Sequence, residues 1–77
     1  MITYSERVAA ALRAEMAGRI PRLTGVQLAD ALGCSQQSAS DRMVGRVPLS
    51  LDELATVCDW LGVDQAEFLA KAAGVAA

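Results

Sequence analysis

A chain of 77 residues has room for one domain, which buries roughly 60% of the surface that its unfolded form exposes and leaves little volume for a deep catalytic cleft. Apolar residues make up 53% of the chain, mostly alanine, leucine and valine, which excludes disorder and suits small, closely packed helices. The net charge of −2 disfavours nucleic-acid binding by the chain as a whole. No apolar run approaches the ~20 residues of a membrane span, and no secretory signal is visible. We therefore expect a cytoplasmic protein without a membrane partner.

The chain has no histidine and two cysteines, Cys34 and Cys58. Two isolated cysteines without histidine do not form a zinc site, so no metal and no cofactor are predicted. Both cysteines are expected to be buried free thiols rather than a disulfide. Acid–base chemistry would need a carboxylate pair in a pocket, and the neighbours Asp52 and Glu53 fit the first turn of a helix better. We expect neither an enzyme nor a small-molecule substrate.

Two capped helices are predicted in the first half of the chain. The capping box Thr3-x-x-Glu6 opens a helix over about residues 4–17, which a glycine ends. A second box, at residues 24–27, opens a helix that ends at Gly33.

Three further helices follow, each again opened by a cap and stopped by a glycine. Ser35 caps the third helix without a reciprocal Glu or Gln, because Ser38 stands at that position, and Gly45 closes it. The patterns at residues 50–53 and 64–67 open the fourth and fifth helices. No sustained alternation supports a strand. The agreement of caps, spacing and stops predicts an all-α fold, a compact five-helix bundle.

Residues 24–45 are typical of two short helices joined by a tight turn, the arrangement that presents a helix to the DNA major groove. Ala29 is small where the two helices would cross, and Gly33 can adopt the left-handed conformation that the turn needs. Cys34 supplies an apolar plug beneath the turn. We expect one helix-turn-helix DNA-binding domain over residues 1–77.

The third predicted helix has an inward face defined by Ala39 and Met43, which are four residues apart. A glutamine amide on the opposite face can donate to adenine N7 and accept from adenine N6, which supplies about 1–3 kcal/mol of discrimination. Exposed glutamines can also be plain solvated surface, but their place directly after this turn favours base readout. The side chains predicted to read base edges are Gln36, Gln37, Ser40 and Asp41.

Charge is unevenly divided along the chain. Six arginines and four acidic residues give residues 1–46 a net +2, and one lysine against five acidic residues gives residues 47–77 a net −4. The local field at the docked face decides DNA binding, although the same arginines could be ordinary surface charges. The residues predicted to contact phosphates are Arg19, Arg22, Thr24, Gln27, Ser38, Arg42 and Arg46. Roughly three to five neutralised phosphates would give a logarithmic salt slope of about −3 to −5.

The sequence resembles the lambda-repressor-like, or XRE-like, helix-turn-helix family over about residues 5–70. The stretches that carry the resemblance are 28–33, 35–36, 42–54 and 61–63. The resemblance implies a five-helix bundle that binds double-stranded operator DNA through its third helix, with base readout at Gln36, Gln37 and Ser40. It implies a transcriptional regulator, which we expect to be a phage-type repressor or Cro-like protein, in the host bacterial cytoplasm if a phage encodes it.

Two other interpretations stay open at this point. The chain could be the antitoxin or autoregulator of a small operon, or a helical module that binds a protein instead of DNA. A mobility shift with random duplex at two salt concentrations separates the last from the others, because a protein-binding module gives no salt-sensitive shift.

Three positions depart from the family pattern. Gly25 stands where many members carry a glutamine that braces the reading residue, so Gln36 is expected to be less firmly oriented. Asp41 would repel phosphate unless it accepts from a cytosine amine. Val44 lacks the polar side chain that often precedes the closing glycine, which removes one expected backbone contact.

The last third of the chain could pack within the domain or form a dimer contact. Its apolar residues that could form such a surface are Trp60, Phe68, Leu69, Ala72 and Val75. A single module covers little DNA, so a weak homodimer, formed or strengthened on DNA, is predicted.

Overall fold

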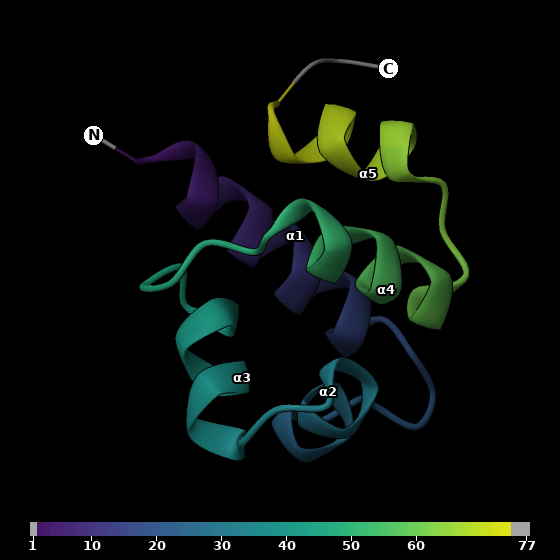
Figure 1. Ribbon diagram of the computed structural model, residues 1–77. Helices are drawn as coiled ribbons and strands as arrows, with labels where there is room; N and C mark the ends of the chain where they lie inside the picture. Colours follow the sequence, from purple (N-terminus) through teal and green to yellow (C-terminus); the bar gives the residue numbers. More distant parts are fainter. Residues whose placement is uncertain (1, 75–77) are drawn as a thin grey trace.

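Five helices follow one another in the computed structural model, which describes residues 2–74 (Figure 1). They are α1 (Tyr4–Ala17), α2 (Gly25–Leu32), α3 (Gln36–Met43), α4 (Leu51–Leu61) and α5 (Gln65–Ala72). Residues 2–74 contain no strand, which confirms the predicted all-α class. No helix in this part of the chain has the length and apolar character needed to cross a membrane.

The predicted caps account for where each helix begins. Thr3, Thr24 and Ser50 form complete capping boxes, in which the cap side chain and the third helical residue exchange hydrogen bonds with each other's backbone N–H groups. Ser35 and Asp64 accept from the third helical N–H without the return bond. The box expected at the start of α5 is therefore only half formed.

Two glycines fix the loops on either side of α3. Gly33 has a φ of 67°, the left-handed conformation that allows the tight turn between α2 and α3. Gly45 has a φ of 82°, and a Cβ atom at this position would lie 2.9 Å from the Cα of Glu6. The loop after α3 thus rests directly on the start of α1. The helix α3 itself ends at Met43 with Val44 as its cap, slightly before the glycine that the sequence marks as its end.

All five helices contribute to one hydrophobic core. Leu12 and Leu28 are fully buried, as is Val57 of α4, and Phe68 of α5 is 2% exposed. Ala39 of α3 is also fully buried, where its small side chain allows α3 to approach its neighbours closely. The core therefore joins the helices of the DNA-binding motif predicted from the sequence to the last helix of the chain.

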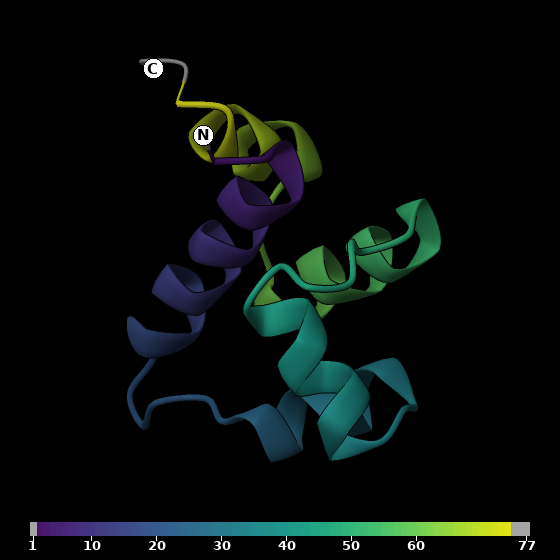
Figure 2. The same ribbon diagram turned by 90° about the vertical axis from the view of Figure 1, so that its left-hand side faces the viewer.

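The helices are arranged so that α5 and α3 lie far apart. Helix α5 packs against α1 and α4, whereas α3 packs against α2 and α1. Figure 2 shows α5 beside the start of α1 at one end of the molecule and α2 with α3 at the opposite end. The outer side of α3 is consequently not covered by the C-terminal helix.

Of the two roles considered for the apolar residues in the last third of the chain, two residues take the one within the domain. Phe68 and Ala72 are 2% and 6% exposed because α5 turns them into the core, so they pack within the domain. Trp60 and Leu69 are half-buried and pack against the same core. Val75 lies outside the described residues.

Both cysteines are free thiols, as predicted. Cys58 is buried in the core, and its burial raises the pKa of the thiol. Cys34 is only half-buried, because it lies within the turn, at the edge of the core, and not beneath the turn.

Candidate nucleic-acid interface

Helices α2 and α3 are joined by a short turn with a hydrogen bond at each end. After Gly33, the backbone N–H of Cys34 donates to the carbonyl oxygen of Ala29 at 3.0 Å, which closes α2. Ser35 then caps α3 by accepting from the N–H of Ser38 at 3.1 Å. The close contact of the two helices fixes which side of α3 faces the solvent.

The outer face of α3, formed by Gln36, Gln37, Ser40 and Val44, is exposed along the helix. Its opposite face carries the buried Ala39 and the half-buried Met43, as the spacing predicts. Two amides and a hydroxyl therefore stand together at the leading end of an exposed helix. Such groups can both donate to and accept from the edges of base pairs.

Asp41 differs from the exposed residues beside it. Its side chain is 21% exposed, and its Oδ1 accepts hydrogen bonds from Gln37 Nε2 at 3.1 Å and from Arg46 Nη1 at 2.9 Å. Its carbonyl oxygen accepts from the backbone N–H groups of Arg46 at 2.9 Å and Val47 at 3.3 Å. Oδ1 of Asp41 is therefore bound by its own neighbours, and Oδ2 is the oxygen of this carboxylate that remains to accept from a cytosine amine.

Arg42 lies against the start of α4. Its Nε donates to Glu53 Oε2 at 2.9 Å, and its Nη1 donates to the carbonyl oxygen of Ser38 at 3.0 Å. The backbone N–H of Ser50 and the Arg42 guanidinium together lower the pKa of Glu53. The Arg42 side chain is only 18% exposed, so its position favours a role in joining α3 to α4 over the predicted phosphate contact.

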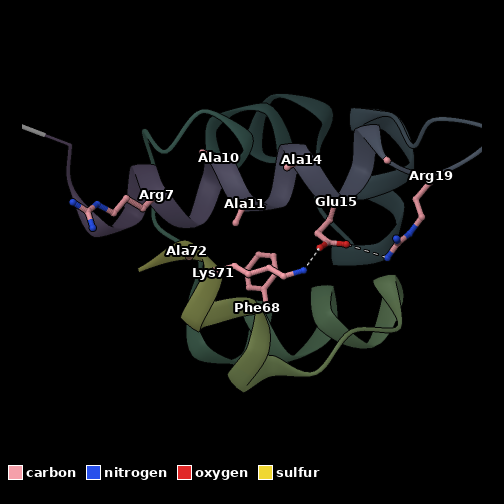
Figure 3. A pocket seen from close by; sticks show the side chains of 10 residues that line it. Arg7, Ala10, Ala11, Ala14, Glu15, Arg19, Phe68, Lys71 and Ala72 are labelled. Atoms are coloured by element: carbon pink, nitrogen blue, oxygen red, sulfur yellow. Dashed lines mark ion pairs between the residues drawn. The ribbon is translucent and has the colours of Figure 1, made fainter. Parts of the chain in front are cut away.

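Arg19 binds partners on α1 and at the end of α4. Its Nη2 donates to the carbonyl oxygen of Leu61 at 2.6 Å and lies 3.5 Å from Glu15 Oε2. Figure 3 shows it at the end of a groove of about 610 Å³ between α1 and α5, with Lys71 paired to the same Glu15. This arrangement separates Arg19 from the other predicted phosphate contacts.

The start of α2 brings together several of the remaining predicted contacts. Thr24 and Gln27 form the capping box, in which Gln27 Oε1 accepts from the Thr24 N–H at 2.8 Å. Arg22 is exposed beside them. The helix dipole adds positive potential at this end, so the site suits a phosphate group.

Arg13 is a candidate that the sequence analysis missed. Its Nη1 donates to the carbonyl oxygen of Met43 at the end of α3. With Arg22, Thr24 and Gly25 it lines a hollow of about 210 Å³ between α1, α2 and α3. Only the packing of α1 on α3 brings Arg13 here, so no local sequence pattern could have indicated it.

The two other predicted phosphate contacts occupy different surroundings. Ser38 is half-buried and its hydroxyl accepts from the Ser35 hydroxyl at 3.1 Å, so it belongs to the cap of α3. The side chain of Arg46 is 70% exposed, and among residues 2–74 it is Nη1 of its guanidinium that is engaged, with Asp41. Arg46 thus keeps guanidinium donors directed to solvent beside α3.

Comparison with known proteins identifies a domain type that extends over nearly the whole chain. A family model described as a helix-turn-helix domain matches residues 6–70. The chain belongs to this family. The helix-turn-helix domain is also similar to the crystal structure of the clp gene regulator ClgR from C. glutamicum, with a TM-score of 0.83 and 35% sequence identity. That match covers 100% of this chain and 97% of the other, whereas no curated protein matches the chain.

Family membership confirms the lambda-repressor-like architecture inferred from the sequence. It assigns the chain to DNA-binding transcriptional regulators rather than to enzymes. In this helix-turn-helix domain, α3 is the second helix of the motif.

Proposed function

We propose that this helix-turn-helix domain binds a specific operator in double-stranded DNA with α3 in the major groove, as a phage-type repressor or Cro-like protein does. The observation that carries the proposal is the exposed outer face of α3, where Gln36, Gln37 and Ser40 follow directly on a rigid turn. Occupying the operator would block polymerase.

Gln36 is the residue we assign to adenine readout. Its side chain is exposed, and within residues 2–74 no hydrogen bond holds its amide. Gly25 has no side chain to brace it, and a Cβ there would meet Met43 Sδ at 3.5 Å. The amide can therefore turn to make the bidentate pair with adenine N6 and N7.

Phosphate contacts are proposed beside α3. Arg13 and Arg22 line the hollow at the start of α2, with Thr24 at the cap of that helix. Arg46 follows the C-terminal end of α3, and most of its side chain is exposed. These three cations offset the negative net charge of the chain at the docked face.

A second regulatory role is supported by the solved relative. ClgR is described as a regulator of a clp gene, and it is 35% identical over the full length of this chain. Control of a host gene, including its own operon, is therefore the alternative to a phage repressor. The two differ in which gene lies beside the operator, not in how α3 would read DNA.

The test is selection of bound sites from a random duplex pool, followed by mobility shifts with the selected site. We expect one enriched motif, and we expect Gln36→Ala to reduce selectivity at one base pair by about 5- to 150-fold. Gln65→Ala is the matched control, because Gln65 is the exposed first residue of α5 as Gln36 is of α3. The proposal fails if the protein enriches no motif or if the two variants behave alike.

We also propose a weak homodimer on DNA, because one module buries only about 600–1,000 Å² on a duplex. Tyr4 and Leu51 are 54% and 84% exposed, and they border a hollow of about 150 Å³ that Leu49 and Leu69 line. This apolar patch is a surface that a second copy could cover. Sedimentation that finds a 1:1 complex on a full-length operator would refute the dimer.

A further inference from the structure

We propose that Asp41 is a positioning residue that fixes the amide of Gln37 in one orientation and thereby limits the bases that Gln37 accepts. The inference rests on the proposed DNA-binding role of α3. Gln37 and Asp41 are one helical turn apart, and Gln37 Nε2 donates to Asp41 Oδ1 at 3.1 Å.

The carboxylate itself is held in place by the loop after α3. Arg46 Nη1 donates to the same Oδ1 at 2.9 Å, and the backbone N–H groups of Arg46 and Val47 donate to the Asp41 carbonyl oxygen. The loop that carries Arg46 is fixed in turn by Gly45, which lies against Glu6. The Asp41 acceptor thus has a defined position before any DNA arrives.

The chemistry of a carboxylate then decides which way the amide points. An ionised carboxylate only accepts hydrogen bonds, so the donor Nε2 of Gln37 must face Asp41. Rotating the amide by a half turn would place Oε1 against the negative oxygen and lose the bond. The Oε1 of Gln37 is therefore directed away from Asp41. The Gln36 amide has no such fixed orientation within residues 2–74.

A fixed acceptor restricts the partner in the major groove. Adenine offers its N6 amine to Oε1 and its N7 to the second Nε2 hydrogen, and cytosine offers its N4 amine. Guanine and thymine offer only hydrogen-bond acceptors there, O6 and N7 or O4, so they can accept from the second Nε2 hydrogen but leave Oε1 without a donor. Gln37 should therefore prefer a base with an exocyclic amine in the major groove, adenine with two bonds first and cytosine second.

The test compares base preference in the wild type, Asp41→Asn, Gln37→Ala and the double variant, using sites selected from a random duplex pool. The asparagine side chain has nearly the same shape as the aspartate but can also donate, so in Asp41→Asn the Gln37 amide can take either orientation. At one position we expect the wild type to favour adenine or cytosine over guanine or thymine by about 5- to 150-fold. Asp41→Asn should lower that ratio at least threefold and leave the other positions unchanged. On the Gln37→Ala background the same change should have no effect at that position.

A second measurement needs no variant. Side-chain ¹⁵N relaxation of the free protein should show the Gln37 amide to be more ordered than the Gln36 amide, because only the former is held. Equal mobility of the two amides would overturn the inference even if Asp41→Asn did not fold.

The ways in which the inference can fail are distinguishable. If the wild type enriches no motif, the proposed function fails and this inference fails with it. If a motif is enriched but Asp41→Asn keeps the base preference, or lowers affinity equally for all bases, Asp41 is merely structural and the inference alone is wrong.

Discussion

Replacing Gly45 with alanine should destabilise the domain far more than the same change at Gly62. Both glycines are left-handed, with φ of 82° and 72°, so an alanine at either costs about 1–2 kcal/mol in backbone strain. At Gly62 nothing lies within 4 Å of the added Cβ. At Gly45 the Cβ meets the Glu6 Cα at 2.9 Å, so the start of α1 must move.

Forcing packed backbone apart costs typically about 1–3 kcal/mol more, so Gly45→Ala should cost about 2–5 kcal/mol in all. A domain of this length is stable by only about 4–12 kcal/mol, so the loss is a large share of the total. Gly18→Ala completes the series, because Gly18 has a right-handed φ of −78°. It should be neutral or stabilise by about 0.4–1 kcal/mol.

The assay is urea unfolding followed by far-ultraviolet circular dichroism. With a slope of about 1 kcal/mol/M for a small domain, the midpoint of Gly45→Ala should lie about 1–3 M below that of Gly62→Ala. Equal midpoints would show that the loop after α3 does not rest on α1 as described.

Two further predictions concern the pH dependence of the Glu53–Arg42 pair and the salt dependence of DNA binding. The Ser50 N–H and Arg42 lower the pKa of Glu53 in the folded state, so its contribution to stability is present above the unfolded pKa of about 4.3 and is lost as pH falls through the folded value. The urea midpoints of the wild type and Glu53→Gln should therefore differ at pH 7 and converge as the pH is lowered below the folded pKa of Glu53. A difference that is independent of pH would contradict the assignment. Arg22→Gln should reduce the logarithmic salt slope of DNA binding by about one unit. Arg42→Gln should instead lower the urea midpoint and leave the salt slope nearly unchanged. If Arg42→Gln reduced the slope and Arg22→Gln did not, Arg42 would be the phosphate contact.

The helices could be predicted from the sequence because their starting signals are local. A cap such as Thr3 and its partner Glu6 are three residues apart, and the hydrogen bonds between them depend on little else. The inner face of α3 was equally readable, since Ala39 and Met43 stand one turn apart. These features depend on short-range geometry that any surrounding fold would preserve.

The partners of individual side chains could not be predicted in the same way. Arg19 finds the carbonyl oxygen of Leu61, and Arg42 finds Glu53, through packing between helices that no local spacing encodes. Phe68 belongs to an apolar stripe that serves a core or an interface equally well, and only the docking of α5 on α1 decides between them. The contact between Gln37 and Asp41 is the exception, because residues four apart on a helix are neighbours.

The placement of Lys71 has a practical consequence for measuring affinity. It is the sole lysine of the sequence, its side chain is 72% exposed, and it lies on α5, at the end of the molecule away from α2 and α3 (Figure 2). Coupling the protein to a biosensor chip through its lysine amine would tether it by that end. The tethered molecules would then display α3 to duplexes in the flow.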